Sequence, residues 1–268
     1  MRVRLLLVAV IAIFSAACQT VQTTQPGAVG VQRKQHMMVS EEQVEKGAQV
    51  AYQQELDKAR TQGALNADKK TYERIQEISR RLIPQTSTFR PDAAKWQWEI
   101  NVQESDEVNA YCMPGGKIMV YTGLIDQLKA TDAELAAVIG HEIAHALREH
   151  SRERLSRAYV EQIALAGIGI ATGAGEGTMQ LAKQVSAVTF TLPHSREQES
   201  EADRIGLELM ARAGYDPSAS ITLWQKMTRL GGGGPEFLST HPSGESRIRD
   251  LQAAVPRVMP LYQSAADR

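Results

Sequence analysis

The pentapeptide His141-Glu142-Ile-Ala-His145 constrains the fold of this chain more than any other feature of its sequence. Thr131 and Glu134 form a capping-box pair, which predicts a helix that begins there and continues through the pentapeptide. Side chains four positions apart lie on one face of a helix, so both imidazoles can bind one metal ion. Glu142 lies beside them, where its carboxylate can act as a general base. We therefore expect a capped, largely apolar helix that carries half of a metal site.

The composition is that of a folded globular chain. Of the 268 residues, 43% are hydrophobic and 23% are charged, which is close to the average for soluble proteins. Lys and Arg total 30 against 31 Asp and Glu, so the net charge is -1. A chain without excess positive charge lacks the electrostatic basis for binding nucleic acid, and no nucleic-acid partner is predicted. The presence of only two cysteines excludes a disulfide-rich scaffold.

The N-terminal residues have the pattern of a secretory signal peptide. Two arginines precede the apolar run of residues 5–14, and small residues lead to Cys18. This ending resembles the lipobox of bacterial lipoproteins, whose cysteine becomes the lipidated first residue of the mature chain. The resemblance implies a signal peptide over residues 1–17 and a lipid anchor on Cys18. Because Gln19 is not the aspartate of inner-membrane lipoproteins, it also implies the bacterial periplasm, at the outer membrane. An ordinary signal peptide is the alternative; lipidation of Cys18 would leave Cys112 as a free thiol.

The rest of the chain divides into a tether, a domain and a tail. Residues 18–39 are rich in Gln, Thr, Gly and Val and are predicted to form the lipidated N-terminus and a flexible tether. Ser40 and Gln43 form a capping box that begins the first helix. The domain is expected to cover residues 40–255 and to be followed by a C-terminal tail over residues 256–268.

Strand patterns precede the pentapeptide and helical patterns follow it. Apolar and polar residues alternate over residues 96–102, as in a half-buried strand. Residues 109–113 and 117–121 flank Pro-Gly-Gly, which predicts a hairpin. The uncharged residues 163–175 indicate a buried helix running into a loop, with a segment that touches lipid as the alternative. The predicted fold class is α+β, mainly helical with a small antiparallel sheet.

The predicted metal site lacks a third protein ligand, which catalytic zinc sites normally have. The candidates are the acidic residues of a helix that Ser195 and Gln198 begin, and three further histidines. Spacing alone does not choose among the acidic residues, because two pairs of them are four positions apart. His150 is expected to face away, because nine positions after His141 is the opposite side of a continuous helix. The candidates are Glu197, Glu199, Glu201, Asp203, His150, His194 and His241.

The pentapeptide and the acidic segment at residues 195–203 together resemble a known family. They are similar to the HtpX and CAAX-prenyl-protease group of zinc metallopeptidases, family forty-eight of the metallo class, in its periplasmic lipoprotein branch. The resemblance implies a gluzincin-type domain with one Zn²⁺ per chain, bound by the two histidines of the pentapeptide and Glu199. It implies Glu142 as the catalytic base and Asp203 as the residue that orients a ligating histidine. Glu201 remains the alternative ligand on spacing alone.

The resemblance extends over nearly the whole predicted domain. Asn109, Ala110 and Tyr111 belong to a predicted strand on which an extended peptide substrate can add by main-chain hydrogen bonds. In this branch a histidine at the place of His241 can approach the open position of the zinc and restrain activity. The alternative is a surface histidine in a Pro-bounded turn. His194 either belongs to the capping region of its helix or donates a hydrogen bond to the reacting carbonyl.

These expectations define two functions. The first is a zinc endopeptidase of the bacterial cell envelope that hydrolyses misfolded or unassembled periplasmic and outer-membrane proteins. The alternative is a zinc-stabilised chaperone or assembly factor for outer-membrane proteins with latent proteolysis, which His241 as a fourth ligand would favour. The predicted partners are unfolded polypeptides and, through Cys18, a membrane, and no protein partner is identified.

Overall fold

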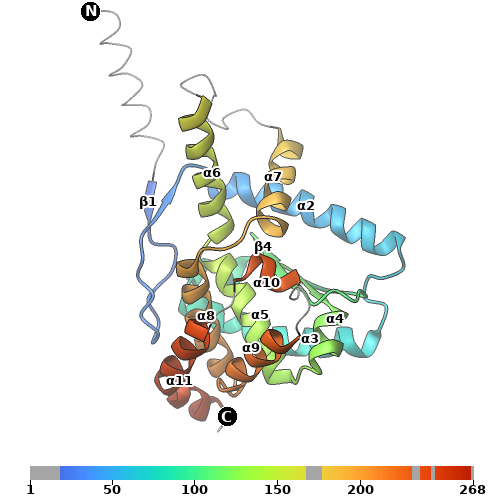
Figure 1. Cartoon of the computed structure of the whole chain (residues 1–268), viewed down its shortest axis with the longest axis vertical. Coiled ribbons are helices and arrows are strands. Elements are labelled where there is room, and N and C mark those ends of the chain that lie inside the picture. Colours follow the sequence, from blue (N-terminus) through green and yellow to red (C-terminus); the bar gives the residue numbers. More distant parts are fainter. Residues whose placement is uncertain (1–18, 167–176, 231–235, 243–244, 267–268) are drawn as a thin grey trace, which may run out of the picture.

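Helices make up most of the computed structural model, which describes residues 19–166, 177–230, 236–242 and 245–266. The predicted mainly helical α+β class is confirmed. Helices α5 and α8 pack together at the centre, α11 packs on α8, and α2 packs on α7 (Figure 1). The helices are α2 Glu41–Thr61, α3 Lys69–Leu82, α4 Thr122–Leu128, α5 Asp132–Leu147, α6 His150–Ala166, α7 Thr178–Phe190, α8 Arg196–Arg212, α9 Ala219–Arg229, α10 Glu236–Thr240 and α11 Glu245–Ala266, with the 3-10 helices η1 Ile83–Thr88 and η2 Pro91–Lys95.

A three-stranded sheet lies beside α5, in the order β3 (Glu99–Gln103), β5 (Lys117–Tyr121), β4 (Ala110–Met113). The predicted hairpin is present: β4 and β5 are antiparallel around a turn in which Gly115 and Gly116 have φ values of 78° and 79°. The sheet is mixed rather than wholly antiparallel, because β5 lies between the other two strands and runs parallel to β3. Strand β4 is therefore at an edge of this sheet.

Residues 19–39 are part of the folded domain, so the prediction of a flexible tether is wrong. Strands β1 (Gln19–Val21) and β2 (Gln35–Met37) pair in antiparallel register. Val29 and Val31 are buried in the main core, with 2% and 3% of their surface exposed. One pair of apolar residues two positions apart is too short to establish a periodic pattern, which is why the sequence indicated a linker.

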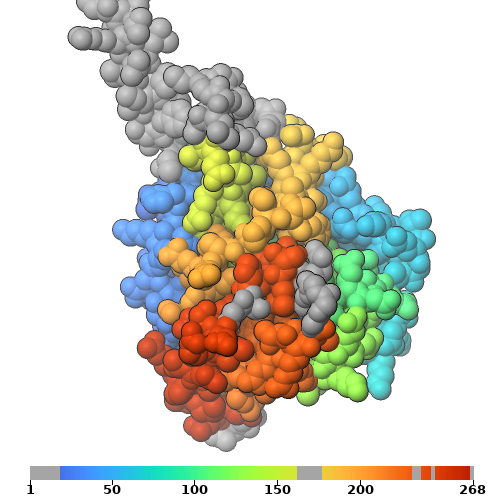
Figure 2. Space-filling model, in the orientation of Figure 1, coloured from blue at the N-terminus to red at the C-terminus, as the bar shows by residue number. Residues whose placement is uncertain are grey.

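The predicted C-terminal tail is also structured. Helix α11 continues to Ala266 through Pro256 and Pro260, and Val258 is fully buried. The domain therefore does not end at residue 255. The predicted signal peptide over residues 1–17 and the lipidated Cys18 lie outside the described residues, as does most of the predicted buried segment at 163–175. Figure 2 shows the C-terminal helices, in orange and red, over the lower part of one face.

Two glycines let α5 and α8 meet backbone to backbone. A Cβ atom on Gly206 would lie 2.7 Å from the backbone nitrogen of His141, and one on Gly140 would lie 3.0 Å from the carbonyl oxygen of Gly206. This contact is closer than any side chain at these positions allows. It brings the pentapeptide of α5 against the acidic turns of α8.

The helix that carries the pentapeptide ends soon after it. Helix α5 ends at Leu147, and Glu149 adopts a left-handed conformation with a φ of 51° before α6 begins at His150. The chain therefore changes direction between the two helices, which invalidates the assumption of one continuous helix. Among the described residues, none of the helices combines the length and the apolar character that crossing a membrane requires.

Candidate metal centre

Helix α5 presents both histidines of the pentapeptide to one point. The predicted capping box of Thr131 and Glu134 is present and fixes the start of the helix. The Nε2 atoms of His141 and His145 lie 3.0 Å apart. Both side chains are buried, with 4% of each residue exposed. The i, i+4 spacing thus places two imidazole nitrogens side by side inside the protein.

Helix α8 brings Glu199 to the same point. The capping box that Ser195 and Gln198 form is also present, and it aligns the first turns of α8. Glu199 is fully buried; its Oε1 lies 3.3 Å from Nε2 of His145, and its Oε2 lies 3.5 Å from Nε2 of His141. Of the acidic residues that spacing left open, Glu199 is the one grouped with both histidines.

The donor atoms fit a zinc ion. A tetrahedral site with Zn–N and Zn–O bonds near 2.0–2.1 Å places neighbouring ligand atoms about 3.3 Å apart. The separations among His141, His145 and Glu199 are 3.0–3.5 Å. Two imidazoles and one carboxylate are also the donor set of a catalytic zinc site. These residues therefore match zinc in both chemistry and spacing.

The electrostatic environment favours a cation at this point. Burial lowers the pKa of His145 well below its usual value, so its imidazole is neutral, as a metal ligand must be. Burial alone would raise the pKa of Glu199, but electrostatic interactions with His241 and Arg247 outweigh it and hold that pKa well below its usual value. Burial alone would lower the pKa of His141, but Asp203 and Glu199 raise it to about 9. The carboxylates thus stabilise positive charge here.

Asp203 contacts the ligand His141, and Arg247 contacts both Asp203 and the ligand Glu199. Nδ1 of His141 lies 3.1 Å from Oδ1 of Asp203, which leaves Nε2 directed at the metal point. Arg247, on α11, bonds both oxygens of Asp203 at 2.8 and 2.7 Å and contacts Glu199 Oε2 at 2.5 Å. Its guanidinium carbon lies 3.7 Å from the centre of the Trp224 ring. The sequence predicted no contact between Arg247 and this site, because no local pattern reveals that α11 packs on α8.

Glu142 points at the space beside the histidines. Burial raises the pKa of its carboxylate, and the nearby backbone N–H of Cys112 on β4 acts in the opposite direction. Its Oε1 lies 3.4 Å from Nε2 of His241. The edge strand and the pentapeptide therefore meet at the carboxylate that a catalytic base would use.

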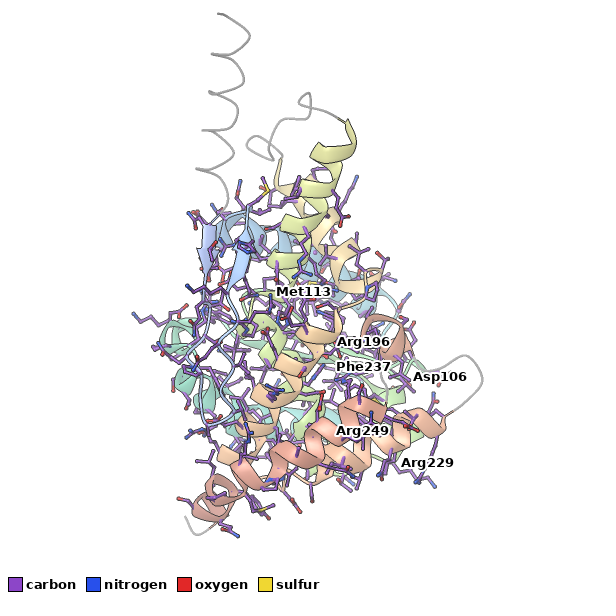
Figure 3. The ribbon with its side chains drawn as sticks, turned by 60° about the vertical axis from the view of Figure 1, so that its left-hand side comes forward. Asp106, Met113, Arg196, Arg229, Phe237 and Arg249 are labelled. Atoms are coloured by element: carbon purple, nitrogen blue, oxygen red, sulfur yellow. The ribbon has the colours of Figure 1, made fainter. Side chains whose placement is uncertain are left out.

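His241 lies inside the site rather than in an exposed turn. Only 3% of it is exposed, and its ring stacks on Phe237 of α10 at 4.3 Å between ring centres (Phe237 is labelled in Figure 3). Its Nδ1 lies 3.1 Å from Glu199 Oε1 and 3.3 Å from His141 Nε2. Its position matches that of a fourth donor atom next to the other three.

Two residues make other contacts than the sequence predicted. His150, which was expected to face away, is fully buried, and its Nδ1 lies 2.8 Å from Nδ1 of His145. Glu201, which was the alternative ligand, instead pairs with His150 and Arg148. The left-handed Glu149 explains the first error, because it returns the chain toward α5. No sequence signal marks this bend, since glycine is the residue usually found there.

The predicted substrate strand borders the metal point. Asn109, Ala110 and Tyr111 line a cavity together with Thr240 and His241. Every residue of β4 is buried, including Met113, which is labelled in Figure 3. Substrate binding at this strand stays a prediction. His194 is buried, with its ring centre 3.8 Å from that of His145.

Comparison with known proteins identifies relatives over most of the chain. The family model of Peptidase family M48 matches residues 69–255 of this chain. The mitochondrial metalloendopeptidase OMA1 of Arabidopsis thaliana is 42% identical over 161 residues, which are 59% of this chain and 31% of that protein. OMA1 of Saccharomyces cerevisiae is 31% identical over 181 residues, 65% of this chain and 51% of that protein. The β-barrel assembly-enhancing protease of Escherichia coli is 32% identical over 178 residues, 61% of this chain and 36% of that protein.

These relatives change two predictions. The chain spans about a third to a half of the length of these relatives. Several of them are mitochondrial proteins, from plant, yeasts and vertebrates, so the prediction of a bacterial periplasmic location is wrong. The resemblance to the HtpX and CAAX-prenyl-protease group holds only at the level of the wider family. With 69–255 matched and the His, His, Glu donor set in place, the chain belongs to peptidase family M48, whose members are zinc metallopeptidases.

Proposed function

We propose that this protein is a zinc-dependent endopeptidase that hydrolyses unfolded or unassembled polypeptides. The observation that carries the proposal is the meeting of three zinc donors with a buried carboxylate that is not one of them. His141, His145 and Glu199 supply the donors, and Glu142 supplies the carboxylate. A structural zinc site needs only its ligands, so a buried carboxylate beside the donors that is not itself a ligand favours a catalytic site.

Different residues of this chain serve different steps of peptide hydrolysis. Bound zinc would polarise the scissile carbonyl and make a water molecule more acidic. Glu142 takes the proton of the attacking water and passes it to the leaving amine. General acid–base help of this kind contributes about 10²–10⁴-fold, or roughly 3–5 kcal/mol. Asp203 holds the ring of His141 in the orientation that binding requires.

The substrate class follows from the edge strand. An extended peptide paired with β4 would bring a main-chain carbonyl next to Glu142, because β4 is an edge strand whose Cys112 N–H lies near that residue. Main-chain pairing accepts many sequences and requires a free strand, which a folded protein does not offer. The name of the Escherichia coli relative, a protease that enhances β-barrel assembly, is consistent with unassembled proteins as substrates.

Replacement of Glu142 tests the proposal. The Glu142→Gln variant is expected to bind one zinc per chain and to lose casein cleavage by a factor of about 10² or more. Glu73→Gln, on an exposed carboxylate of α3, is the matched control and is expected to retain both properties. Zinc is measured by elemental analysis and cleavage by peptide release. Equal casein turnover by wild type and Glu142→Gln would refute the role of Glu142.

The contacts of His241 favour a second candidate, a zinc-stabilised chaperone or assembly factor with latent proteolysis. His241 occupies the space between Glu199 and Glu142, where a substrate carbonyl would have to enter. Under this hypothesis the protein binds unfolded chains while the site stays closed. Activity that rises in His241→Ala supports a restrained peptidase. Suppression of substrate aggregation without cleavage, in wild type and His241→Ala alike, supports the chaperone.

A further inference from the structure

We propose that His150 is a positioning residue for the metal ligand His145. Glu201 and the N-terminal segment, residues 19–39, hold His150 in place. The inference rests on the proposed zinc centre but not on peptide hydrolysis. It assigns a purpose to a buried histidine that belongs neither to the zinc donors nor to the proposed catalytic base. It also explains why residues 19–39 pack beside the site.

The two ligating histidines are arranged alike. Each directs Nε2 at the common metal point, and each has Nδ1 against a partner from another helix. For His141 the partner is the carboxylate of Asp203, at 3.1 Å. For His145 the partner is the imidazole of His150, at 2.8 Å between the two Nδ1 atoms. Such outer contacts fix the orientation and the tautomer of a ligating imidazole.

The position of the protons follows from Glu201. A hydrogen bond between two imidazole nitrogens requires one donor and one acceptor. Nε2 of His150 lies 3.0 Å from Oε2 of Glu201, and a carboxylate only accepts, so the proton of His150 is on Nε2. Its Nδ1 is therefore the acceptor, and His145 donates from its own Nδ1. This leaves the lone pair of His145 Nε2 free for the metal.

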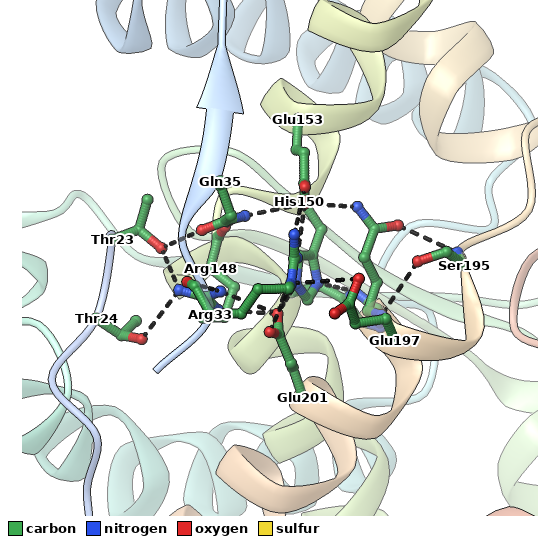
Figure 4. A network of polar contacts seen from close by, with 12 residues as sticks. Thr23, Thr24, Arg33, Gln35, Arg148, His150, Glu153, Ser195, Glu197 and Glu201 are labelled. Carbon is green, nitrogen blue, oxygen red and sulfur yellow. Dashed lines mark hydrogen bonds and ion pairs between the residues drawn. The ribbon is translucent and has the colours of Figure 1, made fainter. Parts of the chain in front are cut away.

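Glu201 is itself held by two arginines (Figure 4). Arg148 donates to Oε2 from Nε and Nη2 at 3.1 and 3.0 Å, and Arg33 donates to Oε1 from Nε at 2.8 Å. Arg33 belongs to the N-terminal segment, and its backbone oxygen accepts from Arg148 Nη2 at 3.0 Å. These charges keep Glu201 ionised and turned toward His150. The N-terminal segment is thus connected to a zinc ligand through three side-chain contacts.

A second metal ion is the competing explanation, because His145, His150 and His194 also lie close enough to share one. Both nitrogens of His150 already make contacts at hydrogen-bond distance, one with His145 and one with Glu201. Binding a second ion through Nδ1 of His150 would replace its contact with His145, and His145 would then have to bind two ions at once. The geometry therefore favours a hydrogen-bonded chain, and zinc stoichiometry separates the two explanations.

Zinc affinity of His150 variants tests the inference, measured by chelator competition at pH 7.5 without substrate. His150→Phe keeps the bulk of the ring and removes both hydrogen bonds, and it is expected to weaken zinc binding 10–100-fold. His150→Gln, which can accept from His145 and donate to Glu201, is expected to recover most of the affinity. The control His36→Phe removes an exposed imidazole of β2 and is expected to bind zinc like wild type.

The tautomer of His145 in the zinc-free wild-type protein is a second readout, which does not require any variant to fold. Nitrogen-15 NMR is expected to show the His145 proton on Nδ1 and the His150 proton on Nε2. The opposite tautomers, zinc affinity of a folded His150→Phe within twofold of wild type, or two zinc ions per wild-type chain would each overturn the inference. Because no readout involves cleavage, an inactive protein would refute the proposed endopeptidase and leave this test intact.

Discussion

Glu199 and Glu201 are two positions apart on one helix, yet they face different partners. Glu199 contacts both ligating histidines, whereas Glu201 contacts His150 and two arginines. Removal of Glu199 is therefore expected to abolish stoichiometric zinc binding. Removal of Glu201 is expected to leave one zinc per chain with weaker affinity. Elemental analysis of Glu199→Ala and Glu201→Ala after dialysis measures the difference, and full zinc occupancy in Glu199→Ala would identify Glu201 as the ligand instead.

Removal of Arg247 is expected to lower the stability of the protein, although Arg247 is not one of the zinc donors. It pairs with two buried carboxylates, Asp203 and Glu199, and taking away one partner of a buried ion pair costs about 3–5 kcal/mol. Arg247→Met is expected to lower the free energy of unfolding by about that amount. Urea denaturation in the presence of a chelator measures it. Arg249→Met, on an exposed side chain of α11, is the control, and equal stability of the two variants would contradict the prediction.

At the scale of elements, the crossing of α5 and α8 decides whether the site can form. Alanine in a helix interior is by itself more favourable than glycine by about 1 kcal/mol. At Gly206 the added Cβ would lie 2.7 Å from the backbone of α5, so the helices must separate. Gly206→Ala is therefore expected to destabilise the protein by about 1–3 kcal/mol and to weaken zinc binding.

The control for that prediction is Gly177→Ala, at the start of α7. A Cβ there meets no atom of the described chain within 4 Å. Thermal unfolding and chelator competition on both variants separate packing at the crossing from a general effect of alanine. Zinc affinity and stability of Gly206→Ala equal to those of wild type would show that the close contact does not position the site.

At the scale of the whole molecule, the N-terminal segment is expected to make stability depend on pH. Burial alone would raise the pKa of Glu153, but hydrogen bonds from Arg33, Gln198 and Gln35 outweigh it and hold the pKa well below its usual value. A carboxyl with a lowered pKa in the folded state stabilises the protein above about pH 4.5, and this contribution is lost as the pH falls further. Glu153→Gln is therefore expected to lose about 3 kcal/mol at pH 7.

The difference in stability between wild type and Glu153→Gln is expected to shrink as the pH is lowered from 5 toward 2. Urea denaturation across this range measures it. Glu42→Gln, on an exposed side chain that pairs with Lys46, is the control, and its difference in stability from wild type is expected to stay small at every pH. A difference that stays constant with pH would mean that the charge of Glu153 does not hold the N-terminal segment.

Local patterns predicted the elements that carry the chemistry. The capping boxes at Ser40, Thr131 and Ser195 are all present, because a cap depends on residues three positions apart. The hairpin of β4 and β5 was predicted for the same reason, from its turn. The parallel pairing of β3 with β5 was not predicted, since it depends on which strand occupies the middle of the sheet.

By itself, the sequence predicted two of the donors and the base, because the spacing of His141, Glu142 and His145 on a helix places both imidazoles on one face with the carboxylate beside them, but that spacing did not choose the third donor. Tertiary structure alone decided which residues surround them. Arg33, His150 and Arg247 reach the site from an N-terminal segment, a second helix beyond a left-handed bend, and the last helix. Their contacts depend on burial and on close backbone crossings between distant parts of the chain. Contacts between distant parts of the chain produce no periodic pattern in the sequence.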